Sequence, residues 1–284
     1  MKIKFIIRFV TVMLMLYFCQ EIKAQKNDWQ KEKLTGRVKS VKDITYKVMD
    51  TFGVVKKGEI KNGYNEDFNS IGNEMEVDFF YKSDSSLNSK NIFKYDEKGK
   101  LIEENIYKSN GRLDTKKTFK YDDKGNEIED DLYKSDGSLD SKYTYKYDEA
   151  GNEIECKVYK SDNNLEHKYI YKYDQKGNQI ERSGYKSDGS ISYKSTSKYD
   201  DNGKKTEDVY YYKSDINFTD KTLFKYDDKG NLIESNTFKF DSTLKIKRNF
   251  EVIYDVNGNW IKRTYFKGEG KIPDEISERE IVYY

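Results

Sequence analysis

The sequence is poor in the residues that interrupt strands, cross-link chains or build catalytic sites: it has one proline, one histidine and two cysteines in 284 residues. Strands tolerate proline badly, because it removes a hydrogen-bond donor from the sheet, so a near absence of proline suits a β-protein. One histidine, His167, argues against hydrolytic triads and histidine-based metal sites. We expect His167 to be an ordinary strand residue at the surface.

The chain also lacks an excess of either charge. It contains 52 Lys and Arg against 51 Asp and Glu, for a net charge of +1, and the two signs are interleaved along the sequence. Proteins that bind nucleic acid usually carry a basic patch or stripe. The sequence therefore predicts no nucleic-acid partner.

The one long apolar run lies at the N-terminus. Basic residues precede it, the uncharged stretch 9–18 forms it, and Ala24 offers a small residue for cleavage. This order is typical of a secretory signal peptide, and the run is too short for a membrane helix of about 20 residues. We predict cleavage after Ala24, export to the periplasm or cell surface, and no membrane-spanning segment afterwards.

The two cysteines leave one alternative open. Cys19 would suit a lipid anchor, although the bulky Phe18 before it fits such processing poorly. Cys156 would be the only thiol left after cleavage, which excludes an intrachain disulfide. Three other repeats carry Glu104, Asp130 and Arg182 at the same position, so we interpret Cys156 as a chance occupant of a strand, although a reactive or interchain thiol is the alternative.

What the chain does contain is a repeated Tyr-Asp-x-x-Gly motif. Its tyrosines recur every 26 to 28 residues, and they are Tyr95, Tyr121, Tyr147, Tyr173, Tyr199, Tyr226 and Tyr254. A fixed period of this length indicates a repeat architecture in which one small unit is stacked many times.

Each unit reads as two strands and two turns. Asp136-Gly137 is a strong signal for a two-residue hairpin loop, which would set Ser135 opposite Ser138 and Asp130 opposite Tyr143. For the turn after Tyr147, a four-residue loop sorts polar and apolar side chains better than a three-residue loop. It would pair Tyr147 with Ile154 and Tyr145 with Cys156.

These registers give the sheet two unlike faces. The apolar face would carry Ile128, Leu132, Leu139, Tyr143, Tyr145, Tyr147, Ile154 and Val158. The charged face would carry Glu129, Asp131, Tyr133, Lys142, Lys146 and Glu155, and the pair of Lys146 with Glu155 recurs in five other units. Such alternation is typical of an antiparallel sheet that is buried on one side. An apolar face this long must be hidden by curling or by a second layer.

We therefore predict an all-β fold, an elongated antiparallel β-meander built from tandem two-strand repeats of about 26 residues. After the signal peptide (1–24) and a short polar linker (25–33), residues 34–284 form a single β-repeat domain. Its parts are degenerate N-terminal units (34–93), regular repeats (94–252) and a C-terminal capping unit (253–284).

The phrase Tyr-Asp-x-x-Gly-Asn-x-Ile-Glu, followed by Tyr-Lys-Ser-Asp-Gly-Ser, resembles the YD repeats of Rhs-type proteins and the MORN-like repeats of bacterial exported proteins. The likeness covers roughly residues 68–266. It implies a β-repeat and no particular activity. In large Rhs proteins such repeats form a shell around a toxic cargo, but this chain is much shorter and shows no cargo domain or autoproteolytic motif.

The sequence names no catalytic residue, metal ligand or cofactor. Carboxylates recur in nearly every unit, whereas a catalytic pair should stand out from the repeat, so we do not expect an enzyme. Asp148, Asp174, Asp200 and Asp227 could be read as calcium ligands, but a side chain that caps its own turn explains them adequately. We expect the inner tyrosines to form the core.

The candidates for partner binding are the tyrosines on the charged face: Tyr107, Tyr133, Tyr159, Tyr185 and Tyr211. We predict a secreted or cell-envelope, non-catalytic binding or scaffold module, whose partner is an unknown protein or a glycan. The alternatives are an immunity or antitoxin component of a toxin system and a glycan-binding surface protein.

Overall fold

The computed structural model describes residues 27–51, 54–81, 87–212, 219–228, 230–270 and 272–284. The predicted signal peptide, with Cys19 and Ala24, lies outside these residues. One short helix, α2 (Asp28–Lys31), precedes eighteen strands. The strands are β1 (Val38–Thr51), β2 (Val54–Phe68), β3 (Glu74–Tyr81), β4 (Leu87–Tyr95), β5 (Leu101–Lys108), β6 (Leu113–Tyr121), β7 (Glu127–Lys134), β8 (Leu139–Tyr147), β9 (Glu153–Lys160), β10 (Leu165–Tyr173), β11 (Gln179–Lys186), β12 (Ile191–Tyr199), β13 (Lys205–Tyr212), β14 (Asp220–Tyr226), β15 (Leu232–Lys239), β16 (Leu244–Tyr254), β17 (Trp260–Lys267) and β18 (Glu275–Tyr283).

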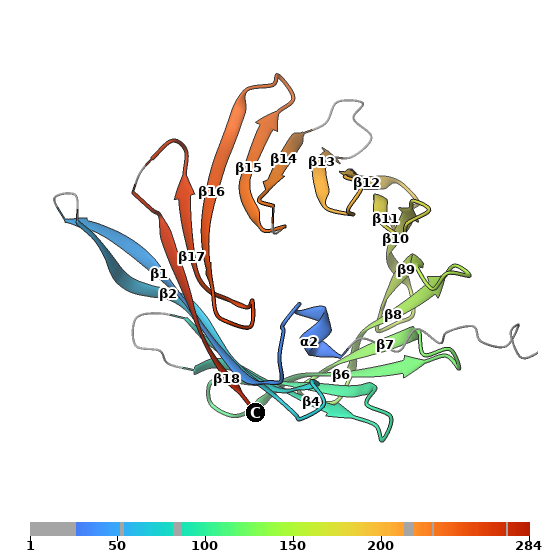
Figure 1. Ribbon diagram of the computed structural model, residues 1–284. Helices are drawn as coiled ribbons and strands as arrows, with labels where there is room; N and C mark the ends of the chain where they lie inside the picture. The colour runs from blue at the N-terminus through green and yellow to red at the C-terminus, as the bar shows by residue number, and fades with distance from the viewer. Residues whose placement is uncertain (1–26, 52–53, 82–86, 213–218, 229, 271) are drawn as a thin grey trace, which may run out of the picture.

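The strands form one antiparallel meander in which each strand pairs with the next along the chain. The last strand, β18, also pairs with β1, from Val38 opposite Tyr283 to Lys47 opposite Glu275. The sheet therefore closes into a barrel, seen as a ring in Figure 1. The predicted all-β meander of two-strand repeats is confirmed. The sequence left open whether curling or a second layer hides the apolar face. The sheet curls into a closed ring, which places this face inside.

The hairpin loops differ from the sequence prediction in a regular way. Gly151 donates its N–H to the Asp148 carbonyl and Asp148 donates to the Asn152 carbonyl, so this loop has three residues, with Gly151 at φ 80°. The predicted four-residue loop is therefore wrong. Ile154, on β9 just after the turn, forms a β-bulge, so Tyr147 pairs with Glu153 while Lys146 still pairs with Glu155. The bulge restores the register that a longer loop would have given.

The same device forms the other turn. Lys134 and Ser138 bracket a three-residue loop that ends in Gly137, rather than the predicted two-residue loop that set Ser135 opposite Ser138. Gly137 alone of the loop has positive φ, which a two-residue loop of the predicted type would require at two positions. A bulge at Asp140 on β8, opposite Leu132 and Tyr133, then brings Asp130 opposite Tyr143, as predicted.

The tyrosine-rich face lines the inside of the barrel. Helix α2 lies within the ring (Figure 1), and its Asp28 contacts the hydroxyl group of Tyr95. The lysine before each motif tyrosine therefore points outward. All six predicted pairs form there, with nitrogen to oxygen distances of 2.5 to 3.0 Å: Lys94–Glu103, Lys120–Glu129, Lys146–Glu155, Lys172–Glu181, Lys198–Glu207 and Lys225–Glu234.

The inner face is less apolar than predicted. Asp130 is 1% exposed in this face, whereas Ile128, which we had placed in the buried apolar set, is 39% exposed. Ile128 occupies the bulge beside Tyr121, which removes it from the regular alternation. A buried carboxylate at Asp130 is possible because Lys117 lies 2.7 Å from its oxygen and Tyr145 donates a hydrogen bond to it.

The segment predicted as a polar linker (25–33) instead contains α2. Asn27 caps the helix by accepting the Gln30 N–H, and the Asp28 and Trp29 N–H groups donate to the Gly72 carbonyl. Trp29 and Leu34 pack against a buried apolar cluster of Val38, Val41 and Phe68. Their apolar contacts explain why this segment docks onto the barrel.

Candidate functional site

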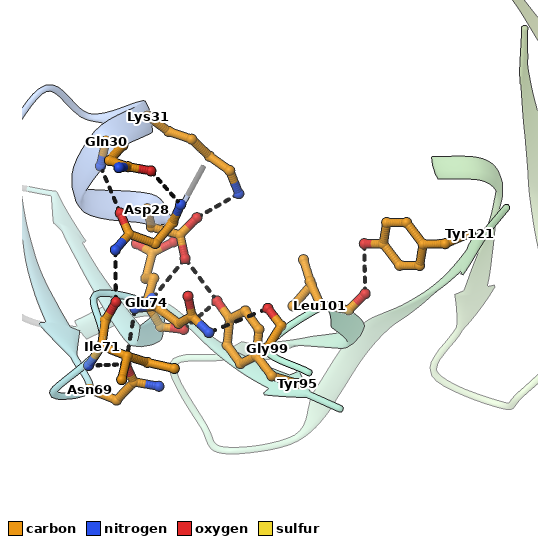
Figure 2. Close-up of polar contacts among 12 residues, drawn as sticks. Asp28, Gln30, Lys31, Asn69, Ile71, Glu74, Tyr95, Gly99, Leu101 and Tyr121 are labelled. Carbon is orange, nitrogen blue, oxygen red and sulfur yellow. Dashed lines mark hydrogen bonds and ion pairs between the residues drawn. The ribbon is translucent and has the colours of Figure 1, made fainter. Parts of the chain in front are cut away.

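Motif tyrosines tie each repeat to the one before it. The hydroxyl groups of Tyr121, Tyr147, Tyr173, Tyr199 and Tyr226 each donate to the backbone carbonyl of a residue 20 or 21 positions earlier, at 2.7 to 2.8 Å. The Tyr121 bond to Leu101 is shown in Figure 2. The hydroxyl groups of these tyrosines therefore form hydrogen bonds within the fold, which agrees with the core role expected for the inner tyrosines.

All the Tyr-Asp turns lie at one end of the barrel, which we call the YD rim. Its turns are residues 69–73, where Phe68 takes the place of the motif tyrosine, and residues 96–100, 122–126, 148–152, 174–178, 200–204, 227–228 with 230–231, and 255–259. Helix α2 docks at this rim: Asp28 accepts hydrogen bonds from the Glu74 N–H and faces the Tyr95 hydroxyl, and Lys31 pairs with Asp28 at 2.7 Å (Figure 2). The N-terminal segment thus partly covers one mouth of the barrel.

The same segment then reaches the last Tyr-Asp turn. Asn259, which is 3% exposed, accepts the Thr35 N–H at 2.8 Å and donates to the Thr35 carbonyl at 2.7 Å. Asn259 also donates to the hydroxyl of Tyr283 on β18, and that hydroxyl contacts Asp255. Residues 27–35 therefore bridge both sides of the β1–β18 closure, which we call the seam.

A cavity of about 420 Å³ lies beside the seam, between this segment and the inner face of β14 to β17. Pockets of about 300 to 1,000 Å³ hold small ligands in other proteins. Its aromatic lining comes from four residues, Tyr226, Phe250, Tyr254 and Trp260. Its charged lining comes from Glu32, Lys33, Arg263 and Arg279. This cavity is the candidate functional site.

Trp260 organises the two arginines. Their guanidinium carbons lie over its ring, Arg263 at 4.4 Å and Arg279 at 3.8 Å from the centroid. Arg279 is further held by Asp43 at 2.9 Å and donates to the Tyr64 hydroxyl at 2.7 Å. Arg263 has no ion pair with any residue in the part of the chain that the structure describes.

Acidic side chains concentrate on the other part of the inner face. Burial, followed by the charges of Glu66 and Asp28, raises the pKa of Glu74 to about 8. Burial and Asp130 likewise raise the pKa of Glu127. The barrel interior therefore has an acidic side, near β3 to β9, and a site with two arginines near the seam.

Sequence analysis missed Arg263, Arg279 and Trp260, although a signal for one of them was present. Arg263 stands nine residues after its motif tyrosine, in the same repeat position as Glu104, Asp130, Cys156, Arg182, Asp208 and Ser235. We call this set, with Arg263, the variable column. It lies on the inner face among constant tyrosines, and its changing chemistry marks where one unit differs from the next.

The tyrosines predicted to bind a partner lie on the outer face, each opposite a lysine. The pairs are Tyr107 with Lys90, Tyr133 with Lys116, Tyr159 with Lys142, Tyr185 with Lys168 and Tyr211 with Lys194. Lys168 lies 5.1 Å from the Tyr185 ring centroid, within cation–π range. All five tyrosines are half-buried. The structure does not bring them together into one pocket, and their binding role stays a prediction.

The contacts of three other residues singled out in the sequence, Cys156, His167 and Asp148, can also be described. Burial raises the pKa of the Cys156 thiol to about 12, so the thiol is protonated at neutral pH. His167 lies with its ring centroid 6.4 Å from that of Tyr169. Both Asp148 carboxylate oxygens accept hydrogen bonds from Asn152, one from its N–H and one from its side chain. This carboxylate caps its own turn.

Comparisons with known proteins are sparse. A family model described only as an uncharacterised protein matches residues 78–146. No curated protein matches the sequence. Within the described residues there is no helix with the length and apolar character needed to cross a membrane.

Several solved structures are weakly similar. A porin-like protein from Bacteroides uniformis is 10% identical, with a TM-score of 0.47, over 87% of this chain and 98% of its own. A porin-like protein from Bacteroides vulgatus is also 10% identical, with a TM-score of 0.40, over the same shares of the two chains. A TcdB2-TccC3 chain is 13% identical, with a TM-score of 0.31, over 72% of this chain and 14% of its own. We infer no function from similarities at this level.

Proposed function

We propose that this protein is an exported, non-catalytic binding protein of the bacterial cell envelope, which holds a small ligand inside its barrel at the YD rim. The cavity beside the seam carries this proposal. It combines aromatic walls with a guanidinium group, that of Arg263, which has no carboxylate partner among the described residues. Binding sites typically pair apolar walls with a few placed polar groups.

The contrast between constant and variable positions supports a binding role. The motif tyrosines are constant and their hydroxyl groups are used by the fold. In contrast, the variable column changes from carboxylate to thiol to guanidinium around the barrel, which gives each sector of the inner face its own chemistry. We interpret the motif tyrosines as the scaffold of the barrel and the variable column as the positions that adapt its inner face to a ligand.

The non-catalytic and exported parts of the proposal rest on the sequence. The recurring outer glutamates, such as Glu155, are committed to lysine pairs, and the Cys156 thiol is protonated at neutral pH. Export follows from the predicted signal peptide, which intact mass of the secreted protein would test through cleavage after Ala24. The YD-repeat resemblance stays a hypothesis about ancestry.

A cavity-filling variant tests the proposal. We would screen neutral sugars, acidic sugars, aromatic acids and nucleosides by thermal shift, because a ligand that binds only the folded state raises its unfolding temperature. Val252 lines the cavity, so Val252→Trp should abolish the shift from any true ligand. Ile253→Trp is the matched control, because Ile253 is the next residue on β16 and is 54% exposed.

The outcome is decisive if both variants fold, as checked by circular dichroism and unfolding temperature. A compound that stabilises the wild type and Ile253→Trp but not Val252→Trp supports the proposal. If no compound binds, or if binding survives in Val252→Trp, the cavity is not the functional site.

The outer tyrosines suggest a second candidate function, a scaffold surface for a protein or glycan partner. The observation in its favour is the regular row of tyrosine and lysine pairs, exemplified by Tyr185 with Lys168. Aromatic residues that present an apolar ring are common binding anchors. Crosslinking in extracts should then be lost in a Tyr133→Ala, Tyr159→Ala double variant and retained in Val252→Trp.

A further inference from the structure

We infer that the ligand of the seam cavity carries a carboxylate on a six-membered ring. This inference rests on the proposed function, because it assigns the chemistry of the same site. Two sources have this chemistry, a uronic acid from a glycan and a simple aromatic acid, and the experiment below separates them.

The charge of the cavity indicates an anion. Two arginines approach one another over Trp260, but only Arg279 has its charge matched, by Asp43 at 2.9 Å. The Arg263 side chain faces the interior from β17 and remains exposed there. A guanidinium group is planar and binds a carboxylate through two parallel hydrogen bonds. A carboxylate is therefore the ligand group that would form an ion pair with the Arg263 guanidinium.

The arginines are held in place before any ligand arrives. The Trp260 ring fixes both guanidinium groups by cation–π contact, and Tyr64 accepts a further hydrogen bond from Arg279. A site whose charged groups are already positioned loses less side-chain entropy on binding. Trp260 is thus a positioning residue, and its ring faces the arginines.

The remaining walls suit a ring. Tyr226, Phe250 and Tyr254 line the cavity from β14 and β16, and its volume of about 420 Å³ exceeds what a lone inorganic ion would fill. Aromatic side chains stack on flat apolar surfaces, including aromatic rings and the C–H face of a pyranose. A ring beside the carboxylate would cover these walls.

Glu32 and Lys33 both line the cavity from the N-terminal segment, so this wall carries one charge of each sign and does not restrict the ligand to one negative charge. A hydroxyl group on the ring of the ligand can donate a hydrogen bond to the Glu32 carboxylate.

Calorimetry with two matched pairs of probes tests the inference. The first pair is D-glucuronate and methyl glucoside, and the second is benzoate and benzyl alcohol. In each pair that binds, the acid should bind at least about tenfold more tightly than its neutral analogue, because a charge-assisted bidentate contact is lost in the latter. The pair that shows this difference identifies the source. Binding should also weaken as salt is raised.

Two arginine variants complete the test. Arg263→Gln should remove at least about tenfold in affinity for the acid and leave the neutral analogue unaffected. Arg248→Gln is the matched control, because Arg248 lies on the neighbouring strand β16 and does not line the cavity. Arg263→Gln loses the cation–π contact with Trp260 but leaves no described carboxylate without its ion-pair partner, so the variant should still fold, as circular dichroism would check.

The inference is overturned if neither acid binds, if neutral and acidic members of a pair bind equally, or if Arg263→Gln leaves the acid affinity unchanged. The proposed function fails separately. It survives if a neutral compound binds and Val252→Trp abolishes that binding, and it falls if Val252→Trp has no effect on any ligand.

Discussion

The regular wall of the barrel and its seam are built from the same strands but held by different contacts. In the wall, from β4 to β15, two contacts recur from unit to unit. A motif tyrosine bonds to a backbone carbonyl about 20 residues back, and an outer lysine pairs with a glutamate nine residues on. At the seam the contacts are unique and join residues more than 200 positions apart.

This difference separates two tasks. Repeated local contacts specify strands and their register, but they would suit an array of any length. Only unique contacts can fix where the array ends and closes, such as Asp43 with Arg279 and Thr35 with Asn259. The most buried apolar cluster also lies at the seam, and so does the candidate ligand cavity.

The largest expected effect comes from breaking the seam ion pair. The Asp43 and Arg279 side chains are each 10% exposed, so Asp43→Ala would leave a nearly buried guanidinium without its partner. We expect a loss of about 3 kcal/mol in unfolding free energy, measured by urea denaturation. The wall control is Lys146→Ala, whose partner is Glu155 and whose side chain is 66% exposed, with a loss below about 1 kcal/mol. Equal losses of unfolding free energy in Asp43→Ala and Lys146→Ala would contradict the distinction between seam and wall.

A smaller effect is expected when the N-terminal segment is released. Asn259→Ala removes the hydrogen bonds to Thr35 and Tyr283, for which we expect a loss of about 2 kcal/mol and faster amide exchange in residues 27–35. The equivalent wall residue is Asn152, whose side chain donates within its own turn to Asp148. Asn152→Ala should cost about 1 kcal/mol or less. Unchanged exchange at 27–35 would contradict the bridging role.

Removing one wall hydroxyl should cost about 1 kcal/mol. Tyr147→Phe loses the 2.7 Å bond to the Glu127 carbonyl, and Tyr199→Phe loses the 2.8 Å bond to the Gln179 carbonyl. Because these bonds belong to separate units, the double variant should lose the sum of the two single losses in urea denaturation. Tyr133→Phe, on the outer face, should change stability little. A strongly non-additive result would show that the wall is not built from independent contacts.

A further prediction concerns the slope of stability with pH and not the loss of one contact. The pKa of Glu74 is raised to about 8 in the folded protein, mainly by burial, so the folded state binds a proton that the unfolded state has released. This contribution is fully present below the unfolded pKa near 4.5 and is lost as pH rises through 8. Unfolding free energy should therefore fall between pH 5 and 8 by less in Glu74→Gln than in the wild type. Glu97→Gln, in an exposed turn, should keep the wild-type slope.

Much of the wall could be predicted from the sequence, because its information is local and repeated. The period of the motif gave the strands, and the sorting of side chains gave the pairs of Tyr145 with Cys156 and Lys146 with Glu155. The loop lengths were wrong because a bulge at Ile154 compensates for a shorter loop. Side-chain sorting depends only on the sum of loop and bulge, so it cannot distinguish the two.

The seam and the cavity could not be predicted in the same way. Closure depends on how strongly the sheet coils over eighteen strands, and no single repeat shows this. The partners Thr35 and Asn259 carry no signal that they meet. Arg263 could have been noticed as a departure within the variable column. Arg279 lies in the last strand, outside the repeat, where the β17–β18 pairing sets it beside Trp260, and only the closed ring brings Asp43 to it.

Closure of the ring is the central claim, and a designed disulfide across the seam tests it directly. The Thr45 and Ser277 side-chain oxygens lie 2.8 Å apart on β1 and β18. With Cys19 and Cys156 replaced by serine, a Thr45→Cys, Ser277→Cys protein should form a disulfide within one chain under mild oxidation and keep its β-sheet circular dichroism. A failure to cross-link, or cross-links only between chains, would contradict the closed barrel.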